Sequence, residues 1–504
     1  MSSLLYNSDK RRLLPKIERF EDYQEKRAIR GKASIKKINE SIFQFKDDDL
    51  SIKLEEWKEN KSKHLAGEIL SHAIITEELS KVQEVKKYLE AENDVIIDWI
   101  LNDKIQSKVI RDKIINNRAK LNYEPKDSLT WMDQAINYYE IGATEKSIRC
   151  LKSALTINKD SGFLIRNASR LYSLFGDNGR SIEILKKSEF YKYDPQILSA
   201  EIAFSQIEGR KTRGIDFGRN LLLNDNFSDF QNSELSGAIG TVEFYDGNFT
   251  KSEKLFDKAL LDSSENSFAQ SLWYKKNPIP LYKFEKYYNS NEIQAHRNAK
   301  NDNYEESLMY AEGWISDEKF SIRPYRTASH LKGVMLENYD EAFDIMKRGI
   351  FNQKIIKQKS DKNEEIGYLN DLAYFSLKDD NIKEAEKYVN QLTKIVNKKG
   401  MIGADEKEYV YLATLGLAAY KIGEIETGRK FYRRSIDFFK RAKKNYSAGS
   451  AFLNYFDEEL EIPNNRDSLL KLRKELDVII NDKSESDLIF LKNRMINKFI
   501  NYQG

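Results

Sequence analysis

Residues 128–161, SLTWMDQAINYYEIGATEKSIRCLKSALTINKDS, contain two amphipathic segments joined by a short turn. Apolar and small residues recur along each segment at the spacing of one face of a helix. Gly142 lies between the two segments, where a tight helix–helix turn needs a residue that tolerates positive φ. Small residues on both segments allow the paired helices to approach closely. The pattern is carried by Trp131, Ala135, Tyr138, Gly142, Ser147, Leu151 and Ala154. We expect Trp131, Tyr138, Leu151 and Ala154 to be mostly buried.

The same pattern recurs along the chain, which indicates a repeat architecture. In residues 162–195, for example, Ala168 and Ser181 take the two small positions. The other clear repeats are residues 233–266, 366–399 and 409–442, and three weaker ones lie near 195–228, 288–321 and 323–356. The recurrence predicts stacked antiparallel helix pairs, without β-sheet, over residues 128–442.

These stretches resemble the tetratricopeptide repeat (TPR), a helix–turn–helix unit of about 34 residues. The resemblance implies an all-α fold, an α-solenoid of TPR-like antiparallel helix pairs whose first helices line a concave groove. The entry to the first repeat also resembles the TPR block of a little-characterised bacterial family, in which such blocks are sometimes found with PIN-type nuclease and Gre-type domains. The residues that carry this second resemblance are Arg118, Leu121, Pro125, Asp127, Trp131, Asp133 and Ala135. No PIN carboxylate set can be placed in this chain.

Outside the clear repeats the helical pattern continues with less regularity. We expect a charged helical N-terminal extension in residues 1–63, a helical region of diverged repeats in 64–127, and a C-terminal helical cap in 443–504. Between them we expect a TPR block in 128–266, an irregular helical segment with one weak repeat in 267–322, and a second TPR block in 323–442. The segment 267–287 breaks the period with Pro278 and Pro280.

Composition excludes several classes of protein. The chain has 504 residues, with 83 Lys and Arg against 80 Asp and Glu, so its formal net charge of +3 gives no global attraction to nucleic acid or membrane. One cysteine, Cys150, excludes a disulfide framework or a multi-cysteine metal site. Neither a secretory signal nor an apolar run long enough to span a membrane is present, so we expect a cytoplasmic protein.

No catalytic or cofactor motif is visible in the sequence. A Gly-rich phosphate loop, a G-x-S-x-G elbow and an H-E-x-x-H motif are all absent. His64 and His72 are eight residues apart and lack a third ligand for a metal. We therefore expect a non-enzymatic protein without a cofactor or a metal.

The expected groove offers the best candidate binding residues. At the inward-facing repeat positions, Arg166 and Arg170 lie one helical turn apart and can reach the same anionic group. The first clear repeat would contribute Met132, Ile136 and Tyr139 to this face. The candidate partner-binding residues are Arg166, Asn167, Arg170, Phe244, Tyr245, Asn370 and Tyr374. This set predicts a scaffold that binds a peptide or a protein element through mixed apolar and basic contacts.

Two basic segments suggest a second hypothesis. Residues 1–46 carry 12 basic and 6 acidic residues, and residues 430–444 carry seven basic residues and one acid. Such segments can contact a phosphate backbone, although they are more often the solvated outer face of a solenoid helix. The candidate basic patch is Arg433, Lys440, Arg441 and Lys444. The alternative function is therefore an accessory or regulatory subunit that contacts nucleic acid, beside a bacterial nuclease.

Overall fold

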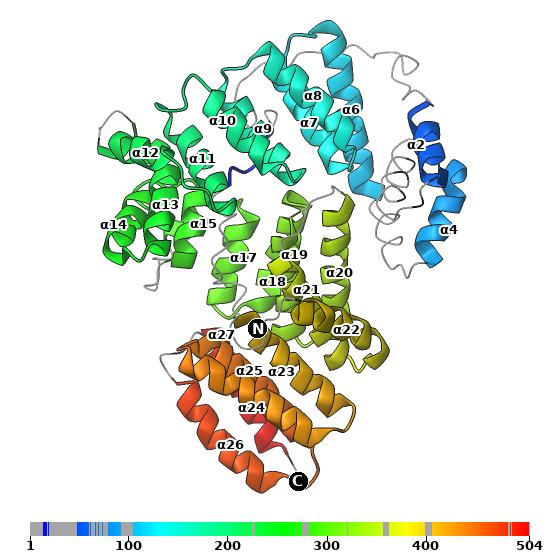
Figure 1. Cartoon of the computed structure of the whole chain (residues 1–504), viewed down its shortest axis with the longest axis vertical. Coiled ribbons are helices and arrows are strands. Elements are labelled where there is room, and N and C mark those ends of the chain that lie inside the picture. The colour runs from blue at the N-terminus through cyan, green and yellow to red at the C-terminus, as the bar shows by residue number, and fades with distance from the viewer. Residues whose placement is uncertain are drawn as a thin grey trace. The chain divides into compact units, whose positions relative to one another are not determined.

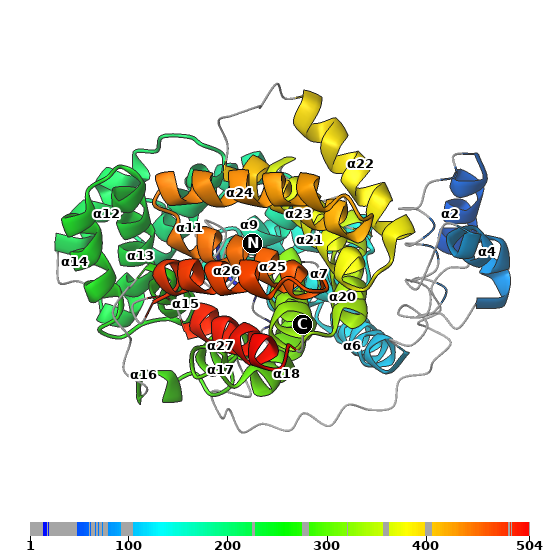
Figure 2. The same ribbon diagram turned by 90° about the horizontal axis from the view of Figure 1, so that it is seen from below.

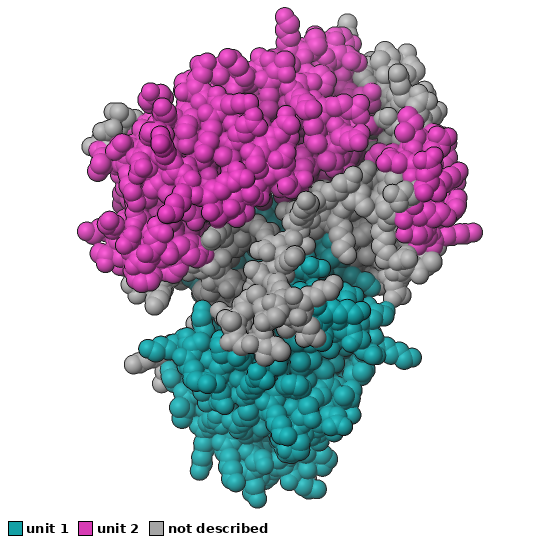
Figure 3. Space-filling view, viewed as in Figure 1, with its two compact units in different colours: residues 1–7, 280–350, 360–504 teal, residues 8–279, 351–359 magenta. Residues whose placement is uncertain are grey.

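The computed structural model describes residues 14–17, 19, 48–59, 61, 66, 69, 73, 79–91, 104–223, 227–274, 282–319, 321–355, 362–398, 406–481, 484 and 486–502. Over these residues every regular element is a helix. The chain divides into two compact units (Figure 3). Unit 1 comprises residues 1–7, 280–350 and 360–504, and unit 2 comprises residues 8–279 and 351–359.

Unit 2 begins with α2 (Asp48–Glu59), η3 (Leu79–Val82), α4 (Gln83–Ala91) and α6 (Lys104–Tyr123). Four helix pairs and a further helix then follow one another along an arc (Figure 1). The pairs are α7 (Ser128–Glu140) with α8 (Thr144–Ile157), α9 (Gly162–Leu174) with α10 (Asn178–Lys187), α11 (Pro195–Ile207) with α12 (Gly214–Leu223), and α13 (Asp229–Tyr245) with α14 (Phe249–Ala259); α15 (Glu265–Tyr274) comes last.

Unit 1 also consists of consecutive helix pairs. After α16 (Tyr282–Glu285), they are α17 (Asn291–Lys300) with α18 (Tyr304–Asp317), and α19 (Ile322–His330), extended by the π-helical turn η4 (Leu331–Met335), with α20 (Tyr339–Ile355). They continue with α21 (Lys362–Lys378) and α22 (Ile382–Lys398), α23 (Glu406–Lys421) and α24 (Ile425–Arg441), α25 (Asn445–Leu460) and α26 (Arg466–Ile479), and end in α27 (Ser486–Ile500). Figure 2 shows α23 to α26 stacked side by side.

A close contact between two small residues, twelve positions apart, holds each regular pair together. The hydroxyl of Ser147 in α8 donates a hydrogen bond of 2.6 Å to the backbone carbonyl of Ala135 in α7. Three further pairs repeat this bond at 2.7–2.8 Å: Ser181 to Ser169, Ser252 to Gly240 and Ser307 to Ala295. Because the hydroxyl reaches the neighbouring main chain directly, a larger residue at either position would push the helices apart.

The turn after each of these first helices has the same conformation. Gly142, seven residues after Ala135, has a φ of +75°. Its N–H donates to the carbonyl of Tyr139, and the N–H of Ala143 donates to that of Tyr138, which is a Schellman helix end. Gly176 and Gly247 also have positive φ, and so do Asp302 and Asp380. The turn therefore does not require a glycine at this position.

The first helices of unit 2 also begin in a common way. Asp127, Ser161, Asp194 and Ser228 are the N-caps of α7, α9, α11 and α13, and each side chain accepts a backbone N–H of the first turn. Such caps satisfy donors that a helix otherwise leaves without partners. Together with the turns, they fix the length and the register of every first helix.

The structure confirms the expected all-α solenoid of TPR-like helix pairs, and the three weaker repeats also form such pairs. One detail of the sequence prediction is wrong. In the second repeat the small residue opposite Ser181 is Ser169, not Ala168. Tyr138, Leu151 and Ala154 are buried as expected, and Trp131 is mostly buried, with its Nε1 donating 2.8 Å to the carbonyl of Pro125. Pro278 and Pro280 lie outside the described residues.

In unit 1 the last helix packs back onto the first pairs. Arg494 of α27 donates hydrogen bonds of 2.8 Å to the carbonyls of Val334 and Met335, at the end of the π-helical turn. Carbonyls at a helix end lack intrahelical donors, so the guanidinium supplies what η4 leaves open. Phe490 of α27 also packs edge-on against Tyr304. The described part of unit 1 is thus tied together from α18 to α27.

The close helix contact predicts a sharp response to one methyl group. A Cβ added to Gly428 would lie 2.5 Å from Cδ2 of Tyr420 and 3.0 Å from the carbonyl oxygen of Gly416. We expect Gly428→Ala to lower the free energy of unfolding by about 1–3 kcal/mol, as overpacking does. Thermal unfolding followed by circular dichroism measures this. The control Gly179→Ala, whose Cβ would meet only an ordinary contact of 3.7 Å, should melt no earlier than the wild type.

The single thiol of the chain reports on the first repeat. Cys150 is 6 % exposed, and burial raises its pKa to about 12. Because the thiolate is the reactive form, we expect Cys150 to react with a thiol reagent at pH 8 at least a hundredfold more slowly in the native protein than in denaturant. Rapid native labelling, absent in Cys150→Ser, would show that the first repeat opens readily.

Candidate functional site

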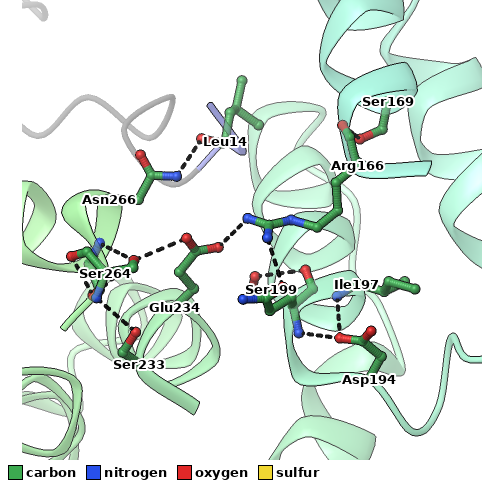
Figure 4. Close-up of polar contacts among 12 residues, drawn as sticks. Leu14, Arg166, Ser169, Asp194, Ile197, Ser199, Ser233, Glu234, Ser264 and Asn266 are labelled. Atoms are coloured by element: carbon green, nitrogen blue, oxygen red, sulfur yellow. Dashed lines mark hydrogen bonds and ion pairs between the residues drawn. The ribbon is translucent and has the colours of Figure 1, made fainter. Parts of the chain in front are cut away.

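Polar side chains connect successive first helices of unit 2. Arg166 of α9 forms an ion pair of 2.7 Å with Glu234 of α13 and donates a hydrogen bond of 2.9 Å to Oε1 of Gln196 in α11 (Figure 4). The hydroxyl of Ser264, immediately before α15, donates 3.0 Å to the other oxygen of Glu234. The ladder of contacts therefore crosses four first helices of the solenoid.

The charges of this ladder are largely removed from water. The side chains of Arg166 and Glu234 are 16 % and 12 % exposed. An ion pair in such a position depends on its geometry and on further hydrogen bonds, because each charge has lost most of its hydration. Gln196 and Ser264 supply those bonds, so the ladder is a fixed arrangement of donors and acceptors.

A short segment from the start of the chain lies against the same helices. Residues 14–17 and 19 have no helical structure, and Leu14 is only 3 % exposed. Leu14 belongs to the apolar cluster of Ile197, Leu198 and Leu235, which come from α11 and α13. Nδ2 of Asn266 in α15 donates 3.3 Å to the carbonyl of Leu14 (Figure 4).

Two cations of this segment meet acids on different helices. Lys16 pairs with Glu265 in α15. Arg19 pairs with Glu140 and donates to Oδ1 of Asn137, both in α7. The segment therefore runs from α15 to α7. We call the contacts of Asn137, Glu140, Glu265 and Asn266, together with the ladder, the groove of unit 2.

The three predicted residues of α9 are all part of a crowded surface. Arg166 is in the ladder, and Nδ2 of Asn167 donates 3.1 Å to the carbonyl of Phe163. Asn167 and Arg170 are both buried. Their roles toward a partner stay predictions, but Arg166 already has an acidic partner within the chain.

The remaining predicted residues of unit 2 lie elsewhere. Met132, Ile136 and Tyr139 of α7 are buried core residues rather than an open groove surface. Phe244 and Tyr245 lie at the end of α13, where Phe244 packs edge-on against both Tyr245 and Phe249 at 5.5–5.6 Å between ring centroids. Tyr245 is 41 % exposed. The two aromatics form a surface cluster at the turn into α14.

In unit 1 the predicted residues Asn370 and Tyr374 are buried and bonded within the unit. The hydroxyl of Tyr374 donates 2.9 Å to Oδ1 of Asn454 in α25, and the hydroxyl of Thr414 in α23 donates 2.8 Å to Oδ1 of Asn370. A cavity of about 20 Å³ lies beside them, which is room for one water molecule. The hollow is too small for a peptide side chain.

A buried lysine of α21, Lys378, forms ion pairs with two acids of α25. Nζ of Lys378 lies 2.6 Å from Oδ2 of Asp457 and 2.9 Å from Oε1 of Glu458. Burial opposes the charge on Lys378, but the two carboxylates raise its pKa well above the ordinary value. These contacts join α21 to α25, so the described inner face of unit 1 is satisfied by its own side chains.

The predicted basic patch is partly neutralised. Arg433 and Lys440 both bind Glu475 of α26, at 2.6 and 3.0 Å. Although burial opposes it, these hydrogen bonds hold the pKa of Glu475 below its ordinary value. Nε of Arg441 donates to the carbonyl of Asp437 in its own helix. Lys444 is the N-cap residue of α25.

The described residues were also considered as ligands of a metal ion and as parts of a membrane-spanning helix. The described residues contain no group of three or more His, Cys, Asp or Glu placed to hold a metal ion. Among the helices described for this chain, none is both long enough and apolar enough to cross a membrane.

Sequence reasoning missed the acidic half of the groove. Glu140, Glu234 and Glu265 lie far apart in the sequence, and no short motif links them. The one available signal is the basic N-terminal segment, which is also typical of a nucleic-acid contact. Lys16 and Arg19 of that segment bind Glu265 and Glu140, while most of residues 1–46 lie outside the described residues.

Comparisons with known proteins find similar folds only. No family model and no curated protein sequence matches the chain. The structure "Crystal structure of APC/C hetero-tetramer Cut9-Hcn1" aligns with a TM-score of 0.40 and 10 % identity, over 89 % of this chain and 92 % of that one. Yeast Tom70 aligns with a TM-score of 0.32 and 14 % identity, over 80 % and 94 %.

A human IFIT1 dimer with PPP-AAAA aligns with a TM-score of 0.29 and 13 % identity, over 89 % of this chain and 93 % of that one. These values identify no family for the chain. The resemblance to a little-characterised bacterial family therefore stays a prediction.

The Arg166–Glu234 pair predicts a measurable coupling. We expect Arg166→Ala to lower the free energy of unfolding by about 1–3 kcal/mol, because it leaves a largely buried carboxylate without its charged partner. The double variant Arg166→Ala/Glu234→Ala should lose less than the sum of the single losses, by about 1 kcal/mol. Urea unfolding of the four proteins gives this difference.

The exposed pair Lys159–Glu189, with N–O at 3.7 Å, is the matched control. Its double-mutant cycle should give a coupling near zero, since exposed ion pairs contribute little. A coupling no larger at Arg166–Glu234 would mean that the ladder does not hold the groove together.

Proposed function

We propose that the chain is a non-enzymatic scaffold that binds an extended peptide or protein element in the groove of unit 2. The observation that carries the proposal is the placement of residues 14–17 and 19, which contact both α15 and α7 through main-chain, apolar and charged contacts. A surface that holds one extended segment in this way has the shape and the donors to hold another.

The chemistry of the groove supports binding rather than catalysis. It presents cations from α9 and acids from α7, α13 and α15, which form hydrogen bonds and ion pairs within the chain. Repeat proteins commonly use such extended concave faces to recognise partners. Arg166, Asn167 and Arg170 remain the proposed contacts from α9, although Asn167 and Arg170 are buried. Asn370 and Tyr374 are left out, because their side chains are bonded to other helices of unit 1.

The alternative, contact with nucleic acid, has less support. Arg433 and Lys440 share one carboxylate, so the patch of residues 430–444 presents less free charge than its sequence suggests. Binding through such a patch would weaken steeply with salt, because counterions are released when phosphates are bound.

The test is identification of the partner followed by titration. Affinity purification from the native host with mass spectrometry identifies it, and the purified partner is then titrated against the wild type and the Arg166→Ala/Arg170→Ala variant. We expect at least tenfold weaker binding by the variant, because a charge-assisted hydrogen bond contributes about 1.5–3 kcal/mol. The matched control Arg210→Ala/Arg213→Ala, at two exposed arginines of unit 2, should bind like the wild type.

Circular dichroism must show that each variant is folded, and a single Arg170→Gln variant replaces the double one if it is not. Equal affinities of folded proteins would contradict the groove as the site. Binding of a single-stranded oligonucleotide that is lost in Arg433→Ala/Arg441→Ala would favour the alternative.

A further inference from the structure

We infer that residues 14–17 and 19 act as an intramolecular ligand of the unit 2 groove and that the partner is a segment of the same chemistry. That segment presents a leucine followed by proline, then two cations three residues apart. The inference rests on the proposed function and adds to it the kind of partner and an internal competitor. It follows from three features of the bound segment.

The first feature is the apolar anchor. Leu14 is buried with Ile197, Leu198 and Leu235, while its carbonyl accepts the hydrogen bond from Asn266. The groove thus recognises a side chain and the main chain of the same residue. Recognition of the main chain carries no sequence preference, whereas the apolar contact selects a residue of leucine-like size.

The second feature is the pattern of charge. Lys16 meets Glu265, and Arg19 meets Glu140 with a further hydrogen bond to the buried amide of Asn137. Acids at both ends of the segment's course select cations at both positions. Arginine is the better group at the second, because its planar fork donates to Asn137 and Glu140 at once.

The third feature is the proline. Pro15 removes a backbone donor, fixes its own φ and restricts the conformation of Leu14, so less conformational freedom is lost on binding. Leu14 contacts α15 and Arg19 contacts α7, so the described residues of the segment bridge these two helices.

The held segment can be exchanged. The side chains of Lys16 and Glu265 are 26 % and 36 % exposed, and ion pairs with this access to solvent contribute modestly. What favours the internal segment is its attachment, since a tethered ligand has an effective concentration of the order of millimolar. A partner with the same contacts must therefore compete against it, and weakening the internal contacts opens the groove.

The experiment uses the full chain and a fluorescent synthetic peptide, RLLPKIERFE, which has the sequence of residues 12–21. Fluorescence anisotropy measures its affinity for the wild type and for Lys16→Ala/Arg19→Ala, in which the internal segment has lost its two charged contacts. We expect the variant to bind the peptide at least tenfold more tightly. A scrambled peptide of the same composition should bind neither protein.

Two further changes in that variant locate the binding. Adding Glu140→Ala/Glu265→Ala should lower the affinity for the peptide at least tenfold, because both partly exposed acids pair with the cations of the segment. Adding Glu183→Ala/Glu189→Ala, two exposed acids outside the groove contacts, is the matched control and should change nothing.

Equal peptide affinity for the wild type and Lys16→Ala/Arg19→Ala would overturn the internal competitor. The inferred partner chemistry would be overturned if the peptide bound tightly and with the same affinity after Glu140→Ala/Glu265→Ala, or if no variant bound the peptide. These failures are distinct from failure of the proposed function, which is decided by the dependence of the isolated partner on Arg166 and Arg170. A partner that requires those arginines but is indifferent to Lys16→Ala/Arg19→Ala would leave the scaffold standing and remove the inference alone.

Discussion

The structure depends on the close approach of two helices at a pair of small residues. Where the hydroxyl of Ser147 reaches the carbonyl of Ala135, the helices lie in close contact, and a Cβ added to Gly416 or Gly428 would collide with a tyrosine ring. Because the helices of a pair lie close together, a short turn with one residue at positive φ can join them, and this turn fixes the direction of the second helix. The stacking of pairs therefore follows from contacts within each pair, as in other repeat proteins.

Stacking first helices against one another creates an inner face whose polar groups need partners. The two units meet this need differently. In unit 1, Lys378 of α21 binds Asp457 and Glu458 of α25, and Tyr374 binds Asn454, so the face closes on itself. In unit 2 the ladder joins Arg166, Glu234 and Ser264 on the inner face. Asn137, Glu140 and Glu265 bind Arg19 and Lys16, which come from outside the repeats.

This difference explains why the groove of unit 2 is the candidate site. Contacts within one solenoid face are rigid, because both partners lie on packed helices. Contacts to residues 14–17 and 19 join packed helices to residues without regular structure, and the Lys16–Glu265 pair among them is partly exposed. A surface completed in this way keeps its acids and amides available for exchange, whereas the buried Lys378 cluster offers nothing to a partner without unfolding.

The sequence by itself determined the repeats, because small and large residues at helical spacing can be recognised locally: Ser147, Ser181 and Gly142 all lie where the pattern predicts. It placed Asp380 at the turn of its repeat but did not indicate the positive φ that Asp302 and Asp380 adopt there, since neither residue is a glycine. Only the tertiary structure decided the groove. Arg166 and Glu234 are 68 residues apart, and Arg19 and Glu140 are 121 apart, so which charges meet depends on the curvature of the stacked pairs. Tertiary packing also buried Asn370 and Tyr374, because whether a first helix faces solvent depends on helices that come later in the chain.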